Sequence, residues 1–153
     1  MKTAISGSQH RRSSCPEEIV FLELLRTADM LSRSLVRVLK TQDLSMNQYN
    51  VLRILRGSSR GLPCGEIASR MITRDPDITR LLDRLEKRGL ISRCRKTKDR
   101  RMVMARISPE GLKLVDRLDA PVQAAHRIEL GHLGRRRLQV LTNLLSISRS
   151  KIG

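Results

Sequence analysis

Cationic side chains are concentrated in one stretch of the sequence, from Ile72 to Arg106, and they could bind a polyanion. The stretch holds twelve Lys or Arg residues against five acidic ones, so it supplies +7 of the net charge of +16. An Arg guanidinium can bond two acceptors at once, on a phosphate or on the edge of a guanine. The stretch also reads as a short helix, a glycine stop and two strands around a charged turn. A rigid helix beside a cationic hairpin fits the grooves of duplex DNA, so we predict a DNA-binding surface here.

Residue patterns of other chemistries are missing from the sequence. No nucleophile–base pairing, paired-carboxylate motif or glycine-rich phosphate loop occurs, so we expect that the protein is not an enzyme and needs no cofactor. The three histidines and three cysteines show no metal-ligand spacing, so no metal site is expected. The chain has no Trp, one Tyr and one Phe. This argues against proteins that bind single strands by stacking bases on aromatic side chains.

The whole chain is basic, and its composition limits the remaining choices. Its 153 residues are 39% hydrophobic, enough for one domain with an aliphatic core. A net charge of +16 predicts attraction to nucleic acid or to an acidic membrane, and composition does not decide between them. No run of 18 apolar residues exists, and the N-terminus lacks the apolar core of a signal peptide. We therefore expect no membrane span and a cytoplasmic location.

Long apolar helices are predicted at both ends of a single domain over 14–149. Ser14 is the expected cap of a helix over 15–40. Residues 1–13 precede it and are expected to form a flexible basic arm. At the other end, residues 109–149 carry leucines at helical spacing. These helices hold more apolar surface than the domain needs for its own core, so we expect them to form a dimer interface.

Residues 44–107 are predicted to form a winged helix-turn-helix unit. Ser45 and Gln48 make a capping box that starts its first helix. Two further helices joined by a tight turn give a helix-turn-helix over about 63–88, and a hairpin over about 90–107 gives the wing. The expected fold class is therefore mainly α with a small β-hairpin wing, flanked by N- and C-terminal dimerisation helices.

The third helix of this unit has clear start and stop signals. Asp75 is predicted to cap it, and Pro76 to occupy its first position. Gly89 should end it in the left-handed conformation. Two strands follow, at roughly 90–96 and 101–107, and the second alternates as a half-buried strand does. The helix and the hairpin together carry the cationic stretch.

The chain resembles the MarR-type transcriptional regulators over roughly residues 17–149. The segments that carry the resemblance are LSMNQYNVLRIL (44–55), GEIASRM (65–71), DITRLLDRLEKRGLISR (77–93), DRR (99–101) and ISPEGLKL (107–114). Each is weak alone, but together and in this order they are specific. The resemblance implies a homodimer with intertwined end helices, in the bacterial cytoplasm and on the nucleoid when bound to DNA. It also implies a repressor that a small-molecule ligand releases from a palindromic operator.

The resemblance also implies roles for single residues. The helix over 75–88 would be the recognition helix and the turn at 96–101 the wing. Arg101 would reach the minor groove, with Asp99 helping to hold it. Pro63 stands where the family usually has a Ser or Thr cap, and Pro offers no such side chain. The candidate DNA-binding residues are Pro76, Asp77, Thr79, Arg80, Asp83, Arg84 and Lys87 on the helix and Arg95, Lys96, Lys98, Asp99, Arg100 and Arg101 on the wing.

Two positions on the helix are the best candidates for reading bases. Arg80 and Arg84 are one turn apart, opposite the apolar stripe, and each can pair with the O6 and N7 atoms of guanine. The alternative is that they touch only phosphate or solvent. Asp77, near the helix start, more simply complements the helix dipole. Thr79 is a candidate phosphate contact.

Other interpretations of the chain remain open. Cys15 lies at a predicted helix start, where backbone dipoles lower a thiol pKa, so a thiol-based redox-sensing regulator is one alternative. Aligned on the LSMNQY segment, however, the cysteine of peroxide-sensing relatives falls near Phe21, six residues away. Cys64 and Cys94 are expected to be structural. The net charge also fits a low-specificity architectural DNA-binding protein, or a membrane-surface protein if an amphipathic helix stays unburied.

Overall fold

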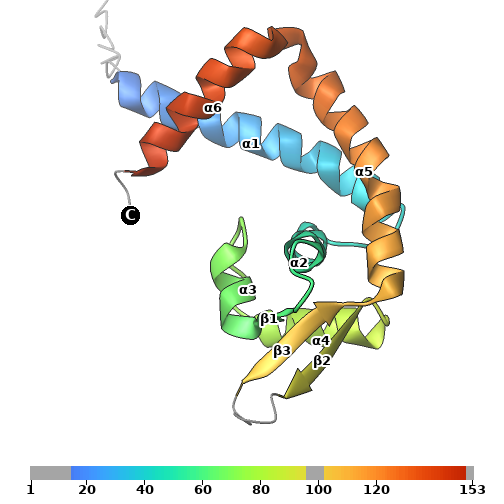
Figure 1. The fold of residues 1–153 in the computed structure, drawn as a ribbon. Helices are drawn as coiled ribbons and strands as arrows, with labels where there is room; N and C mark the ends of the chain where they lie inside the picture. Colours follow the sequence, from blue (N-terminus) through green and yellow to red (C-terminus); the bar gives the residue numbers. More distant parts are fainter. Residues whose placement is uncertain (1–14, 96–101, 151–153) are drawn as a thin grey trace, which may run out of the picture.

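The computed structural model describes residues 15–95 and 102–150 and shows long helices arching over a lobe of short elements (Figure 1). In chain order the elements are α1 (Pro16–Lys40), α2 (Met46–Arg56), β1 (Leu62–Pro63), α3 (Cys64–Arg70), α4 (Ile78–Lys87), β2 (Ile91–Arg95), β3 (Val103–Ile107), α5 (Pro109–Leu130), a 3₁₀ turn (Gly131–Leu133) and α6 (Gly134–Ser150). α5 packs against α1, and the chain then turns back as α6. The lobe contains α2, α3, α4 and the strands.

Local capping residues start two of the helices, α2 and α5. The hydroxyl of Ser45 accepts from the N–H of Gln48 (3.1 Å), and the Gln48 side chain accepts from the N–H of Ser45 (2.9 Å), which confirms the capping box. The Ser108 hydroxyl accepts from a first-turn N–H of α5 (3.0 Å). The prediction for α1 was wrong by one residue. Its cap is Cys15, which makes no capping side-chain bond, whereas Ser14 lies outside the described residues.

The wing belongs to a three-stranded antiparallel sheet with the strand order β1–β3–β2. In the hairpin, Ile91 pairs with Ile107. The third strand corrects the expected two-stranded wing, since Leu62 in β1 pairs with Ala105 in β3. A strand of two residues leaves no alternation in the sequence, so periodicity could not indicate it. Its effect is to tie the entry of α3 to the wing.

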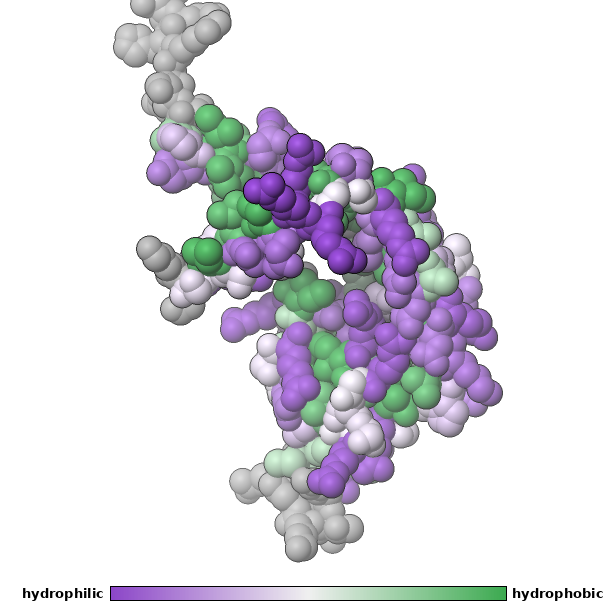
Figure 2. Space-filling model, turned by 45° about the horizontal axis from the view of Figure 1, so that its top comes forward, coloured by the Kyte–Doolittle hydropathy of each residue, from purple (hydrophilic) through white to green (hydrophobic). Residues whose placement is uncertain are grey.

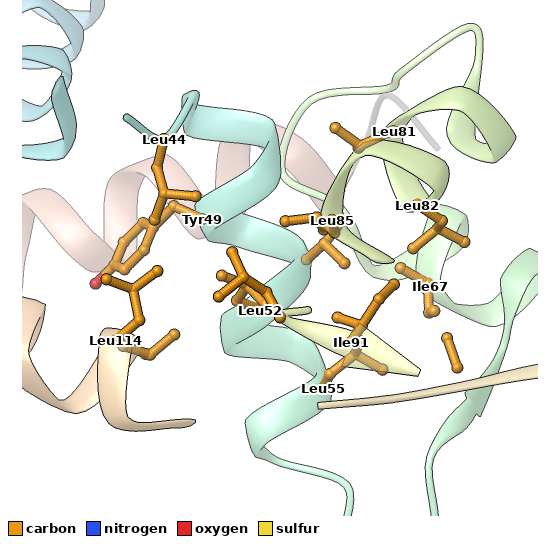
Figure 3. Packing of buried hydrophobic residues seen from close by; sticks show 14 of the residues in the cluster. Leu44, Tyr49, Leu52, Leu55, Ile67, Leu81, Leu82, Leu85, Ile91 and Leu114 are labelled. Atoms are coloured by element: carbon orange, nitrogen blue, oxygen red, sulfur yellow. The ribbon is translucent and has the colours of Figure 1, made fainter. Parts of the chain in front are cut away.

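The hydrophobic core lies around α2, which contacts α5, α4 and the sheet. Leu52 and Leu55 of α2 are fully buried. In Figure 3, Leu44 and Tyr49 lie side by side next to Leu114 of α5. Full burial of one such leucine stabilises the fold by about 1.5–3 kcal/mol. This cluster therefore fixes the position of the lobe against the N-terminal half of α5.

The long helices, in contrast, keep apolar side chains on the surface. Across the described length of α1, Leu39 is the one buried residue, and α6, described in full, has none. Phe21 is 58% exposed and Leu144 60%. Figure 2 shows hydrophobic surface gathered near the start of α1. An exposed apolar face of this extent is typical of an interaction surface.

Candidate nucleic-acid interface

One face of α4 is buried and the opposite face carries cations. Leu81, Leu82 and Leu85 are buried against the core. The other face presents cationic residues that are all exposed: Arg80, Arg84 and Lys87. They are four and three residues apart and therefore lie along one side of the helix. The buried face holds α4 in place, so this cationic row has a fixed position.

The start of α4 differs from the prediction. α4 begins at Ile78, and its cap is Asp77, whose Oδ1 accepts from the N–H of Arg80 (3.0 Å). Asp75 was predicted to be the cap, but it accepts from the N–H of Asp77 (3.0 Å) instead. This bond spans two residues and forms a turn, which delays the helix by two positions. Pro76 consequently lies in the turn and not at the first helical position.

The capping bond of Asp77 explains its place in the sequence better than base contact does. The side chains of Asp77 and Arg80 also form an ion pair with a 3.7 Å Nε–Oδ2 distance, and Arg80 remains 73% exposed. An exposed pair of this kind contributes little free energy, so Arg80 can exchange it for a DNA acceptor. Thr79, in the first turn, is exposed as well.

Arg93 connects the wing to α4, which the sequence interpretation missed. Its side chain is 20% exposed, and its guanidinium forms ion pairs with Glu86 and Asp83. Asp83, predicted on the DNA-binding face, therefore binds Arg93 and does not point freely to solvent. The bonds to Glu86, followed by those to Asp83, raise the pKa of Arg93. The sequence did carry a signal for this contact, because the acidic Asp83 and Glu86 precede Gly89 and the basic Arg93 follows it.

The wing cations are described only in part. Arg95 is exposed at the end of β2. The other predicted wing residues lie outside the described residues: Lys96, Lys98, Asp99, Arg100 and Arg101. Arg74, between α3 and α4, is also exposed and was not among the predicted contacts. Pro63 is the N-cap of α3 and makes no side-chain capping bond, as its residue type predicts.

The cysteines are free thiols in different environments. Cys15 is exposed at the start of α1, and Cys94 is exposed on β2. Cys64 is half-buried, with its Sγ 3.6 Å from the carbonyl oxygen of Val103. Cys94 therefore does not have the buried environment expected of a structural cysteine. Within the described ranges, no three His, Cys, Asp or Glu side chains are grouped to hold a metal ion.

A cavity of about 190 Å³ lies between the lobe and the long helices. Leu35 of α1 and Met46 of α2 give it apolar walls, and Arg53 and His126 add groups that can bind an anion. The guanidinium carbon of Arg53 lies 5.9 Å from the centre of the Tyr49 ring. Burial raises the pKa of Tyr49, so its hydroxyl stays protonated and can donate.

Comparison with known proteins identifies the family. A family model described as the MarR family matches residues 44–103. A crystal structure of a MarR transcription factor from Planctomyces limnophilus is 39% identical in sequence. The match covers 90% of this chain and 99% of that one, with a TM-score of 0.69. The chain belongs to the MarR family. The predicted fold class is thereby confirmed, and the family and fold are those of transcription regulators.

Two other relatives align with most of this MarR-family chain. The homoprotocatechuate degradative operon repressor of Escherichia coli is 28% identical over 108 residues, 71% of this chain and 72% of that protein. CouR from Rhodococcus jostii RHA1, solved bound to p-coumaroyl-CoA, is 26% identical with a TM-score of 0.75, covering 92% of this chain and 95% of its own. Among the described helices of this regulator, none is long and apolar enough to cross a membrane.

Proposed function

We propose that this MarR-family regulator is a homodimeric repressor that binds a pseudo-palindromic operator and is released from it by a small anionic ligand. The observation that carries the proposal is the exposed cationic row on α4, whose opposite face is buried in the core. A helix fixed in this way can enter the major groove with its side chains in a defined position. A run of charged residues without a packed face could not hold its side chains in a defined position in the groove.

The proposed contacts divide into base reading and phosphate binding. Arg80 and Arg84 read bases, because an Arg can discriminate guanine by about 1–3 kcal/mol. Phosphate contacts position the protein on the duplex without reading its sequence. These contacts come from residues on the helix and the wing: Thr79, Lys87, Arg95, Lys96, Lys98 and Arg100. Arg101 enters the minor groove, and Asp99 orients it.

A second copy of the chain is the proposed partner of the exposed apolar helices. We assign 15–40 and 109–149 as dimerisation helices, with the winged unit 44–107 between them. A surface hollow of about 710 Å³ is open, and Leu141 and Leu144 of α6 are among the residues that line it. We assign it to this interface and not to a ligand, because it belongs to an uncovered apolar face. In the DNA-bound dimer the two α4 helices should lie about 34–36 Å apart.

The cavity beside α2 is the proposed ligand site. Its volume of about 190 Å³ is below the roughly 300 Å³ of typical drug-sized sites, so it suits a single-ring compound. Arg53 and His126 favour a carboxylate on that compound. CouR is solved with a small molecule, p-coumaroyl-CoA, and another relative is the homoprotocatechuate degradative operon repressor; both support regulation by a small molecule, and the cavity alone suggests its size. The ligand can release DNA only if it binds the DNA-incompetent arrangement more tightly.

Selection of bound fragments from the source genome tests the proposal. Recovered fragments should share a palindromic site, and binding to it should survive a large excess of bulk genomic DNA at physiological salt. Loss of binding under that competition would instead indicate an architectural DNA-binding protein. Sedimentation equilibrium tests the dimer directly. A monomer at micromolar concentration would contradict the assignment of α1 and α6.

A further inference from the structure

Two asparagines of α2 hold the segment that connects α3 to α4. Asn47 donates from Nδ2 to Asp75 Oδ2 over 2.8 Å, and Asn50 Oδ1 accepts from the N–H of Ile72 over 2.9 Å. The two asparagines are three residues apart in the helix, so their amides lie on the same face of α2. Segment 71–77 is therefore attached to α2 near both of its ends.

The hydrogen bonds continue from Asp75 into the first turn of α4. Asp75 Oδ1 accepts from the N–H of Asp77, and Asp77 Oδ1 accepts from the N–H of Arg80, each at 3.0 Å. The Asp77 N–H and then the Asn47 amide lower the pKa of Asp75, so it is an ionised acceptor at neutral pH. Asn47 is thus connected through two carboxylates to the backbone of Arg80.

The position of this first turn matters more for base reading than for attraction to DNA. A hydrogen bond to a base edge weakens steeply when its length or angle departs from ideal geometry. Attraction between a cation and phosphates falls only slowly with distance. A small displacement of α4 would therefore reduce discrimination between sequences while leaving binding to non-specific DNA nearly unchanged.

We propose that Asn47 and Asn50 are positioning residues for sequence recognition, which set the first turn of α4 by holding segment 71–77. The inference rests on the proposed function, because it requires α4 to read bases. Both amides also line the cavity beside α2, as do Ile72 and Thr73. The same hydrogen bonds therefore connect the wall of the proposed ligand site to the recognition helix.

A swap of side chains between positions 47 and 75 provides the first test. Asn47→Asp places two carboxylates opposite each other and removes the donor. The double variant Asn47→Asp/Asp75→Asn restores a donor and an acceptor with the direction reversed, and it has the same net charge as the wild type. An aspartate in the first turn of a helix is favourable, so α2 itself should not be weakened. The single variant Asp75→Asn completes the double-mutant cycle, which measures the coupling between positions 47 and 75.

The measured quantity is the ratio of affinities for the selected operator and for a scrambled duplex. We expect Asn47→Asp to reduce this ratio by about tenfold, which is the loss of one base contact, and the double variant to restore most of it. Hydrogen exchange at the N–H of Arg80 should accelerate in Asn47→Asp and slow again in the double variant. A merely structural role would change exchange throughout the lobe.

A matched pair at position 50 gives an independent test. Asn50→Asp keeps an acceptor for the N–H of Ile72, whereas Asn50→Leu, of similar size, removes it. We expect Asn50→Leu to lower the operator-to-scrambled ratio and Asn50→Asp to keep it within about twofold. If Asn47→Asp and Asn50→Leu both keep the wild-type operator-to-scrambled ratio, this inference is overturned and the proposed function is not. A wild-type protein that does not prefer its operator would overturn the proposed function as well.

Discussion

Arg93 in β2 donates hydrogen bonds to the Glu86 carboxylate of α4 from both its side chain and its backbone. Its Nε and Nη2 donate to Glu86 Oε2 over 3.0 and 2.7 Å, and its N–H donates to Oε1 over 3.0 Å. Nη2 also reaches Asp83. The strand that carries the wing and the proposed recognition helix therefore form one rigid unit. Two acidic side chains beside the proposed DNA surface are neutralised in the same arrangement.

Replacing Arg93 should weaken both the fold and DNA binding. Arg93→Gln leaves two carboxylates without their cation, and we expect a loss of about 1–3 kcal/mol in the free energy of unfolding. Operator affinity should fall because Asp83 and Glu86 then repel phosphates. Urea unfolding and titration with operator DNA measure the two effects. The double variant Arg93→Gln/Glu86→Gln should lose less than the sum of the single losses. Additive losses would contradict the link.

Arg80 and Arg84 should determine sequence discrimination. Arg80→Ala and Arg84→Ala should each weaken operator binding by about 1–3 kcal/mol and relax the base preference at one position of the half-site. Arg88→Ala is the matched control, because Arg88 is at the end of the same helix but donates to the carbonyl oxygens of Gln42 and Asp43. It removes the same charge without removing a proposed base contact. Equal effects of all three variants on discrimination would contradict base reading by Arg80 and Arg84.

Arg101 and the salt response test the proposed role of the wing. Arg101→Ala should weaken operator binding strongly while the dimer stays folded, because the side chain is proposed to lie in the minor groove. For the wild type, the logarithm of the affinity should fall with that of the salt concentration, with a slope of about −0.9 per phosphate neutralised. Operator titrations at several salt concentrations measure both. Unchanged affinity of Arg101→Ala at physiological salt, or a flat salt response, would contradict the assignment.

The parts of the fold that depend on neighbouring residues could be predicted from the sequence. The Ser45–Gln48 capping box is local, and so is the end of α4, where Gly89 adopts a φ of 70°. The N–H of Leu90 bonds the carbonyl of Leu85 there, which completes the expected motif. Patterns of this kind hold because both partners lie within one or two turns of the chain.

The start of α4 shows why the rest could not be predicted. Asp75 and Asp77 both suit a helix cap, and local propensity does not choose between them. The hydrogen bond from Asn47 of α2, 28 positions earlier, holds Asp75 in the turn, so that Asp77 becomes the cap of α4. The same holds for the Arg93 cluster, since a charge run is read as a solvated face until its partners are known. Contacts between elements, and not propensities, determined which predicted residues remain free to bind DNA.

Gly111 should tolerate no side chain. A Cβ at this position would lie 2.1 Å from the carbonyl oxygen of Leu90, because α5 passes directly over the turn after α4. Gly111→Ala should therefore destabilise the protein by about 1–3 kcal/mol. Gly65→Ala in α3 is the control, since nothing lies within 4 Å of its Cβ, and it should be neutral or stabilising by up to about 1 kcal/mol. Urea midpoints at fixed protein concentration compare them, and equal midpoints would show that the contact can relax.

The ion pair between Arg56 and Asp119 should make stability depend on pH. Arg56 of α2 donates from Nη1 and Nη2 to the two carboxylate oxygens of Asp119 in α5, over 2.7 and 3.1 Å. These bonds lower the pKa of Asp119 in the folded protein. A lowered carboxyl pKa stabilises the fold above the unfolded-state pKa of about 3.9, and the contribution disappears as the pH falls through the folded-state value.

Asp119→Asn should therefore lower the unfolding free energy at pH 7 by about 1 kcal/mol, and the difference from the wild type should shrink as the pH falls below the unfolded-state pKa of about 3.9. Urea unfolding at pH 7, 5, 4 and 3, at one protein concentration, measures this. Glu23→Gln is the control, because its pair with Arg26 is exposed on both sides and should contribute little at any pH. A difference between wild type and Asp119→Asn that stays constant from pH 7 to pH 3 would show that ionisation of Asp119 does not contribute to stability through this pair.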